Sequence, residues 1–286
     1  MTTSLRKIGT TILSRLPPSV GSVARLAYSG ISHPRYGWCG DYRSWPEAQA
    51  ASGGYDRFAI LERVKSSMLK VKRGEAVYER DSVVFDKVEY SWPLLAGLMW
   101  AAAQHDGALR VLDFGGSLGS TYFQNRAFLT GLRRVRWSIV EQPHFVACGK
   151  EHFANDELTF YASTEDCLRT EQPNVIVLSS VLQYLEQPYQ QLQALIDLDV
   201  PHIILDLTPV FGDKDRITVQ KVPPEIYDAS YPCWIFGEDR LRAFLSERCH
   251  LVADFDCALG QSLTLDRGSR AKYRGYILTV NRGRRN

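Results

Sequence analysis

The sequence lacks three features that would each point directly to a class of function. Its six cysteines form no Cys-x-x-Cys pair, so they predict neither a zinc cluster nor a dithiol redox site. The formal net charge is only +2 at pH 7, so a strongly basic nucleic-acid-binding chain is excluded and no nucleic acid is expected as a partner. The uncharged run 91–104 is shorter than the roughly 20 apolar residues that cross a membrane.

Further absences concern compartment and metals. No secretory segment precedes the cysteines, which favours reduced thiols and a cytoplasmic protein. Cys249 and His250 have no other ligand types nearby, so no metal site is predicted. Both ends are basic, at residues 6–25 and 282–285, and they are either solvated termini or weak peripheral contacts with anionic lipid. The sequence gives no indication of the oligomeric state.

What is present begins with the stretch 110–120, where a short apolar run ends in Asp113 and is followed by three glycines. This order predicts a strand, a tight turn and the start of a helix. Glycines let the main chain approach a ligand closely, and the helix N-terminus adds free N–H groups. A carboxylate just before the first glycine suits a ligand with an ammonium group or ribose hydroxyls better than a pyrophosphate. The pattern therefore favours S-adenosylmethionine over NAD.

From residue 110 onward strands and helices alternate, which predicts a parallel sheet covered on both faces. Two final strands joined by a polar loop predict an antiparallel hairpin at its edge. The fold class is thus α/β, a Rossmann-like doubly wound sheet that is mainly parallel, with a C-terminal antiparallel edge hairpin and an N-terminal helical appendage. We expect the appendage over 1–85 and the cofactor-binding domain over 86–286. The predicted strands are 111–114, 137–140, 158–161, 174–178, 202–207, 252–258 and 276–280, and the predicted helices between them are 122–132, 143–153, 188–196 and 238–247.

The N-terminal part predicts helices and one aromatic loop. Residues 36–46 are rich in aromatic side chains and glycine without either secondary-structure period, so an ordered loop is expected, serving as a structural plug or as a lid over a ligand. Ser44 and Glu47 have the spacing of a helix capping box. The predicted helices are 5–16, 20–27, 44–51, 56–73 and 93–104, the last of them apolar on all sides and therefore buried.

Four stretches give the chain a resemblance to the class I S-adenosylmethionine-dependent methyltransferases, and more narrowly to a family of putative bacterial methyltransferases. They are GWCGDY at 37–42, LDFGGSLGS at 112–120, SSVLQYL at 179–185 and VPPEIYDASYP at 222–232. The resemblance implies the strand order 3-2-1-4-5-7-6. Members of the narrower family are associated with surface-polysaccharide genes, which implies a role in polysaccharide biosynthesis.

The resemblance also implies a set of cofactor contacts. At the cradle the class pattern is acid-x-Gly-x-Gly-x-Gly, and here Ser117 replaces the middle glycine. Glu141 ends the second strand, where this fold places the carboxylate that binds the ribose hydroxyls. After the third strand, Ser163 and Asp166 either contact the adenine or cap a helix. The predicted cofactor-binding residues are Asp113, Gly115, Gly116, Ser117, Gly119, Glu141, Gln142, Ser163, Asp166, Ser179 and Ser180.

The acceptor is expected to meet the segment 208–236, which leaves the cofactor edge of the sheet after the fifth strand. This segment is rich in Tyr, Asp and Arg, and two prolines at 223–224 stiffen it. Each side chain could equally make a loop hydrogen bond. The candidate catalytic residues are Arg216, Tyr227, Asp228 and Tyr231, acting on a small-molecule or saccharide acceptor by O- or N-methylation.

Two rival functions remain open at this point. Asp213 and Asp215 form an Asp-x-Asp that could hold a divalent ion with a nucleotide sugar, as in a glycosyltransferase, although this leaves Glu141 and the glycine cradle unexplained. The second rival is a non-catalytic methyltransferase-like subunit that binds a partner, consistent with the substituted middle glycine.

Overall fold

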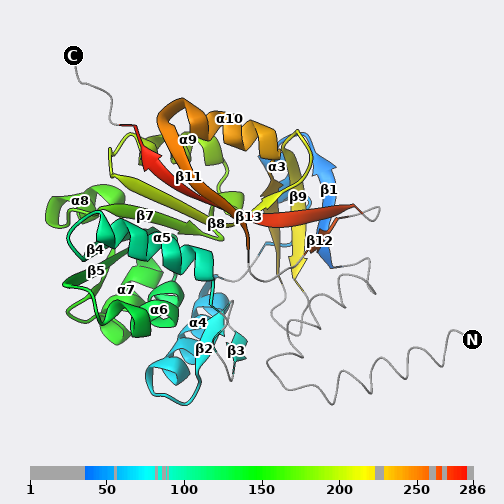
Figure 1. Ribbon diagram of the computed structural model, residues 1–286. Helices are drawn as coiled ribbons and strands as arrows, with labels where there is room; N and C mark the ends of the chain where they lie inside the picture. The colour runs from blue at the N-terminus through cyan, green and yellow to red at the C-terminus, as the bar shows by residue number, and fades with distance from the viewer. Residues whose placement is uncertain are drawn as a thin grey trace, which may run out of the picture.

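The computed structural model describes residues 36–54, 57–80, 83–85, 88, 90–222, 229–257, 262–265 and 269–281. Its largest feature is a sheet in which strands lie in the order β11-β13-β8-β7-β4-β5-β6 (Figure 1). The short strand β12, Ser262–Thr264, pairs with β13 off this path. The main strands are β4 Ala108–Phe114, β5 Arg134–Val140, β6 Leu158–Tyr161, β7 Val175–Ser179, β8 His202–Val210, β11 Cys249–Asp256 and β13 Arg270–Val280.

The direction of the strands confirms the predicted fold. β4, β5, β6, β7 and β8 pair in parallel, whereas β13 runs antiparallel to both β8 and β11. Numbered along the chain, these strands have the order 3-2-1-4-5-7-6 with an antiparallel C-terminal hairpin at the edge. The main difference from the sequence prediction is length, because β8 and β13 run further than 202–207 and 276–280.

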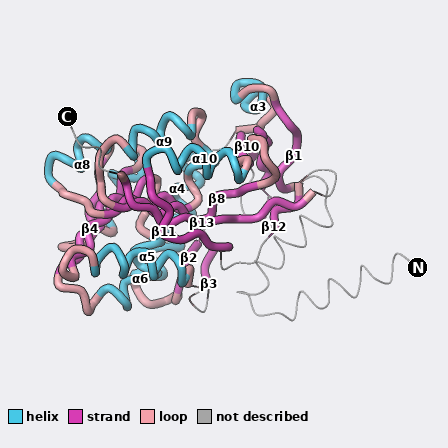
Figure 2. Tube along the Cα trace, turned by 45° about the horizontal axis from the view of Figure 1, so that its top comes forward, coloured by secondary structure: helices cyan, strands magenta, loops and turns pink. Residues whose placement is uncertain are grey.

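Alternating apolar side chains along the strands create two buried faces, since successive residues of a strand point to opposite sides. On β8, Ile204 belongs to one hydrophobic cluster, while Ile203 and Leu205 belong to the other. Helices cover both faces, so the sheet is doubly wound (Figure 2). On the Ile204 face lie α4 Arg57–Lys72, α5 Trp92–Ala103, α6 Ser120–Leu129 and α7 Pro143–His152, and on the other lie α8 Thr164–Thr170, α9 Pro188–Ile196 and α10 Glu238–Arg248.

The predicted apolar helix before the first parallel strand is α5. Leu98 and Ala101 are fully buried against the sheet, as expected for a helix without a polar face. The large side chain that departs from this pattern is that of the first residue, Trp92, which is 56% exposed. Among the described residues, none of the helices is both long and apolar enough to cross a lipid bilayer.

A second sheet corrects the prediction of a loop at 36–46. β1, Gly37–Tyr42, pairs antiparallel with β9, Arg216–Val222, which pairs antiparallel with β10, Ala229–Ile235. The loop prediction was wrong because the partner of β1 lies far along the chain, so no local period shows the strand. The expected packing through aromatic rings is confirmed, since Trp45 stacks on Trp234 with ring centroids 6.2 Å apart.

The helix that follows β1 is α3, Trp45–Ala50, and its predicted cap is present. The Ser44 hydroxyl accepts a hydrogen bond from the Glu47 N–H at 3.3 Å. Two short strands, β2 Tyr78–Arg80 and β3 Val83–Phe85, form a separate hairpin beside α4. The predicted helices 5–16 and 20–27 lie outside the described residues. The domain boundary at residue 85 stays a prediction.

Candidate functional site

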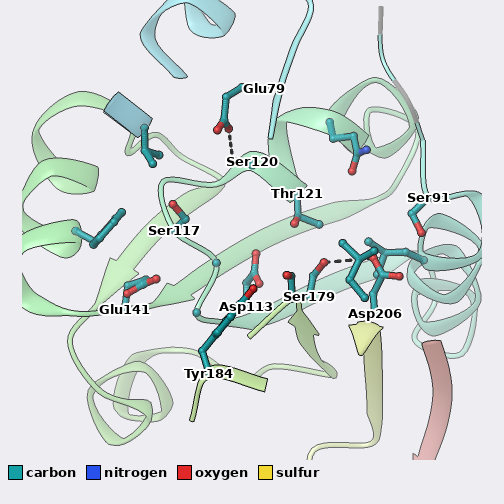
Figure 3. Close-up of a pocket in the computed structure, with 18 of the residues that line it drawn as sticks. Glu79, Ser91, Asp113, Ser117, Ser120, Thr121, Glu141, Ser179, Tyr184 and Asp206 are labelled. Atoms are coloured by element: carbon teal, nitrogen blue, oxygen red, sulfur yellow. Dashed lines mark hydrogen bonds between the residues drawn. The ribbon is translucent and has the colours of Figure 1, made fainter. Parts of the chain in front are cut away.

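A cavity of about 330 Å³ lies at the carboxyl ends of β4, β5 and β7 and beside residues 206–207 of β8. Its volume falls within the roughly 300–1,000 Å³ of small-molecule sites. The neighbouring strands β4 and β7 are where the strand order reverses, and open parallel sheets bind ligands at such a switch point. Residues of α4, β2 and the segment 90–94 cover it from the N-terminal part of the chain (Figure 3).

The loop from β4 to α6 forms the floor of this cavity. Gly115 has φ of 72°, and a Cβ added there would lie 2.4 Å from Val181 Cγ2, so only glycine fits. Ser117, at the substituted glycine position, itself adopts φ of 54°. Among the described non-glycine residues with positive φ, Ser117, Ser180 and Leu207 all line the cavity. Such strained conformations cluster at functional sites.

Asp113 lies beneath this loop and is 1% exposed. Its Oδ2 accepts a hydrogen bond of 2.9 Å from Trp137 Nε1. Burial raises the pKa of Asp113 to about 7, the Trp137 bond lowers it, and the charge of Glu141 raises it. A Cβ on Gly116 would lie 2.5 Å from the Asp113 carboxyl carbon, so the loop rests directly on this acid.

We expect the substitution Asp113→Asn to stabilise the ligand-free protein increasingly as the pH rises. Folding raises the pKa of Asp113 from 3.8 to about 7. Between pH 3.8 and pH 7 the native wild type therefore holds a proton on Asp113 that the unfolded chain has lost. The stability of the wild type falls over this pH range, whereas that of the variant does not. Relative to its value at low pH, the difference in free energy of unfolding between variant and wild type should grow to on the order of 4 kcal/mol at pH 7 and stay constant at higher pH. Urea unfolding of both proteins at pH 4, 6 and 8 measures it, and a pH-independent difference would refute the shift.

Glu141 follows β5 and lies at the edge of the same loop. Its Oε2 accepts the Gln142 N–H at 2.6 Å, and the Ser117 N–H also bonds to the carboxylate. Burial raises the pKa of Glu141, and these two main-chain bonds lower it. The acid is thereby held at the rim of the cavity that it lines.

Ser179 and Ser180 stand at the end of β7 and also line the cavity. The Ser179 hydroxyl donates to Asp206 Oδ2 at 3.3 Å, and the Ser180 N–H donates to the Asp206 carbonyl at 3.0 Å. Ser179 and Asp206 are register partners of the parallel pair β7–β8. The two serines at the end of β7 therefore connect the predicted site to the neighbouring strand β8.

Several predicted cofactor residues lie outside the set that lines the cavity. Ser163 caps α8, where its hydroxyl accepts the Asp166 N–H at 3.1 Å, and Asp166 pairs with Arg169. Gln142 is exposed at the start of α7 and contributes its N–H to Glu141. Gly119 is the N-cap of α6 with φ of 97°, which shapes the loop from outside the cavity.

Of the predicted catalytic residues that the structure describes, one lines the cavity and one does not. Arg216 donates to the Gly40 carbonyl from Nε at 2.9 Å and from Nη2 at 2.7 Å, so it ties β9 to β1 and does not line the cavity. Tyr231 on β10 does line it, and its ring lies edge-on to Tyr184 with centroids 5.4 Å apart. Tyr227 and Asp228 lie outside the described residues. No described residue of 36–46 lines the cavity, so the structure gives no support to the lid, and the plug stays a prediction.

Sequence reasoning missed two buried acids of the cavity. Glu79 on β2 and Asp206 on β8 are each 2% exposed, and Glu79 accepts the Ser120 hydroxyl at 2.6 Å. Asp206 had a usable signal, because it is an acid near the end of a predicted apolar strand, as Asp113 is. Glu79 had none, since it falls in a segment without any period.

The cavity is acidic. Four carboxyl groups line it, and the described lining residues include no lysine, arginine or histidine. Such a site favours a cationic or neutral ligand over a phosphate or carboxylate. The four acids are Glu79, Asp113, Glu141 and Asp206.

The Asp-x-Asp at 213–215 has a structural task. The Asp215 side chain is buried, and its carboxylate accepts the Gly237 N–H at 2.8 Å and the Tyr189 hydroxyl at 3.1 Å. The carboxylate also lies 3.0 Å from Arg240 Nη1. In the part of the chain that the structure describes, no three His, Cys, Asp or Glu side chains are grouped as metal ligands. The geometry therefore gives no support to a metal-dependent glycosyltransferase.

The chain is similar in structure to several solved proteins. Mitomycin 7-O-methyltransferase MmcR is 14% identical with a TM-score of 0.46, over 95% of this chain and 75% of its own. An S-adenosylmethionine-dependent methyltransferase from Clostridium acetobutylicum ATCC 824 is 9% identical with a TM-score of 0.44, over 76% of this chain and 98% of its own. The N-terminal domain of EvdMO1, crystallised in the presence of SAH and D-fucose, is 13% identical with a TM-score of 0.44, over 80% of this chain and 97% of its own.

The fold rests on the strand order and directions given above. No family model matches the chain, and no curated protein matches it.

Proposed function

We propose that the protein is an S-adenosylmethionine-dependent methyltransferase that acts on an oxygen or nitrogen of a small-molecule or saccharide acceptor. The single observation that carries the proposal is the acidic cavity at the β4–β7 switch point, floored by a glycine loop and edged by Glu141. The ligand carries a sulfonium and an ammonium group, both cationic, and a ribose diol. Carboxylates complement both cations and the ribose hydroxyls, and the main-chain N–H groups of the loop complement the carboxylate that the ligand also carries.

The residues present fit this ligand. Glu141 would accept hydrogen bonds from the ribose hydroxyls, and the loop at 115–117 would support the ligand closely because no Cβ fills the space at Gly115. Asp113 would face the ammonium side through the loop. Ser179 and Ser180 would line the methionine part at the end of β7. The adenine contacts proposed for Ser163 and Asp166 use the segment after β6.

On the acceptor side, Tyr231 is the described candidate from the 208–236 segment, and Tyr227 and Asp228 remain proposals. When bound, S-adenosylmethionine supplies an activated methyl group on sulfur. The chain's own task is to hold the acceptor in line about 3–3.5 Å from that methyl and to exclude water. The cysteines form no disulfide and are mostly buried, which accords with a cytoplasmic enzyme. The stretches quoted above support surface-polysaccharide biosynthesis as the setting.

We expect the product S-adenosylhomocysteine to bind with a micromolar dissociation constant, about −8 kcal/mol. Isothermal titration calorimetry of the full chain measures it. Absence of heat and of a thermal shift at millimolar ligand would overturn the proposal and favour the non-catalytic partner-binding subunit. A shift with nucleotide sugar and Mn²⁺ alone would favour a glycosyltransferase.

We expect Glu141→Ala to weaken S-adenosylhomocysteine binding by about 1–3 kcal/mol, because charge-assisted hydrogen bonds to the ribose are lost. Calorimetry on the folded variant gives the change. Glu151→Ala is the matched control, since this acid on α7 has a side chain that is 74% exposed. Equal affinities of the Glu141 variant and the control would remove Glu141 from the site.

A further inference from the structure

The cavity acid on β8, Asp206, has no place in the proposed cofactor contacts. Asp206 lines the cavity and is 2% exposed, and it lies one strand beyond Ser179. Figure 3 shows Asp206 and Glu141 on opposite sides, with Asp113 and Ser179 between them. A ligand whose ribose meets Glu141 and whose methionine part reaches the end of β7 carries its sulfonium between these two points, and Asp206 on β8 lines the cavity beside the end of β7.

Two side chains hold the Asp206 carboxylate in place. The Ser179 hydroxyl donates to Oδ2 at 3.3 Å, and the Cys257 thiol donates to Oδ1 at 3.2 Å. Burial, and then the charge of Asp206, raise the pKa of the Cys257 thiol, so this group stays protonated and remains a donor. Both groups donate hydrogen bonds to the carboxylate oxygens, and the oxygens of an ionised carboxylate can accept hydrogen bonds and protons.

The main chain at this point is strained. Leu207 adopts φ of 52°, an uncommon conformation for a bulky residue, and its N–H donates to Cys257 Sγ at 3.3 Å. The pairing of β8 with β13 shifts register opposite this position, between Arg274 and Tyr276. The local departure from a regular strand coincides with the residue next to Asp206, as expected where a fold positions a functional side chain.

A second polar group lies on the same side of the cavity. Ser91 Oγ is buried and has no hydrogen-bond partner among the described residues, although Ser91 lines the cavity. Figure 3 places Ser91 and Asp206 toward the same side of the view. A buried polar atom without a partner is costly, and a bound polar group would satisfy it.

The other three acids of the cavity have different tasks. Glu141 is held by the main chain at the β5 end, Asp113 lies beneath the glycine loop, and Glu79 on β2 accepts the Ser120 hydroxyl on α6. Only Asp206, among the described acids that line the cavity, extends from the strand beyond β7.

We propose that Asp206 faces the transferring methyl group and is the catalytic residue that accepts the proton of the acceptor, which must therefore be a hydroxyl or an amine. A lone pair of the acceptor oxygen or nitrogen forms the bond to the methyl carbon, and the carbon–sulfur electron pair passes to sulfur. The acceptor proton moves to an Asp206 oxygen, leaving a neutral carboxyl group. An acceptor that presents a carboxylate or phosphate to this end is disfavoured, because it offers no proton and meets a like charge. This inference rests on the proposed function.

The test needs no knowledge of the acceptor. Sinefungin carries an amine-bearing carbon in place of the methyl-bearing sulfur, so its ammonium occupies the methyl position, whereas S-adenosylhomocysteine has no group there. Calorimetry of the wild type should show sinefungin binding at least about tenfold more tightly. In Asp206→Asn this preference should fall about tenfold, or about 1.4 kcal/mol, while S-adenosylhomocysteine affinity stays within about threefold.

Glu151→Ala is the control, because it removes an exposed acid of α7 outside the cavity and should keep the preference for sinefungin. Asp206→Ser provides a second variant if Asp206→Asn does not fold. Equal affinities of the two ligands in the wild type, a preference that survives in a folded Asp206 variant, or loss of S-adenosylhomocysteine binding in that variant would each overturn the role of Asp206. If the wild type binds neither ligand, the proposed function itself fails.

Discussion

Gly115→Ala is expected to lower the free energy of unfolding by about 2–5 kcal/mol and to weaken S-adenosylhomocysteine binding more than about tenfold. The left-handed backbone of Gly115, with φ of 72°, costs an alanine about 1–2 kcal/mol. The new Cβ would also lie 2.4 Å from Val181 Cγ2, and such overpacking typically costs about 1–3 kcal/mol more. Any movement of the loop that relieves the contact displaces the floor of the cavity, so affinity falls with stability.

Two further variants separate the causes. Gly74→Ala has nearly the same backbone angle, φ of 75°, but no atom within 4 Å of the new Cβ, so it should show the backbone cost alone and keep full affinity. Val181→Ala combined with Gly115→Ala should recover part of both losses, because it removes the nearest methyl group. Urea unfolding and calorimetry measure the set. Identical behaviour of Gly115→Ala and Gly74→Ala would show that contact with Val181 is irrelevant.

Much of the main sheet is predictable from sequence because its strands have a local signature. Apolar runs such as 174–178, separated by helices with polar faces, have only one arrangement that buries both faces. The position of Asp113 and Glu141 follows from the same reasoning, since the residue that ends a parallel strand must lie at the carboxyl edge. These inferences depend on residues near one another in the chain.

The small sheet could not be predicted in this way. β1 contains Gly37 and Gly40, shows no alternation, and is stabilised by β9 from the other end of the chain. The hydrogen-bond partner of Arg216 could not be predicted either. An arginine is expected to donate hydrogen bonds, but its type does not say to which group, and here the acceptor is the Gly40 carbonyl. Glu79 reaches the cavity only because the N-terminal part folds over the sheet edge.

Trp137→Phe is expected to lower the free energy of unfolding by about 3 kcal/mol at pH 8 and by only about 1–2 kcal/mol at pH 5. Trp137 is fully buried, and its Nε1 is 2.9 Å from Asp113 Oδ2. Phenylalanine cannot donate this bond, so the buried carboxylate loses a partner in addition to the packing lost with the larger ring. At pH 5 Asp113, with a pKa of about 7, is protonated in the native state, and mainly the packing loss remains.

The pH dependence distinguishes this account from simple loss of packing. The Trp137 hydrogen bond lowers the pKa of Asp113, so its removal raises that pKa further. As the pH rises, the native variant either keeps the proton on Asp113 or buries a carboxylate without this donor, and both lower its stability. Urea unfolding at both pH values measures the effect. Trp92→Phe is the control, because Trp92 is 56% exposed and its substitution should change stability by no more than about 0.5 kcal/mol at either pH.

In an Asp113→Asn background the pH dependence of Trp137→Phe should vanish, because the titrating partner is gone. If the dependence persists there, another group is responsible, and the coupling between Asp113 and Trp137 under the glycine loop is wrong.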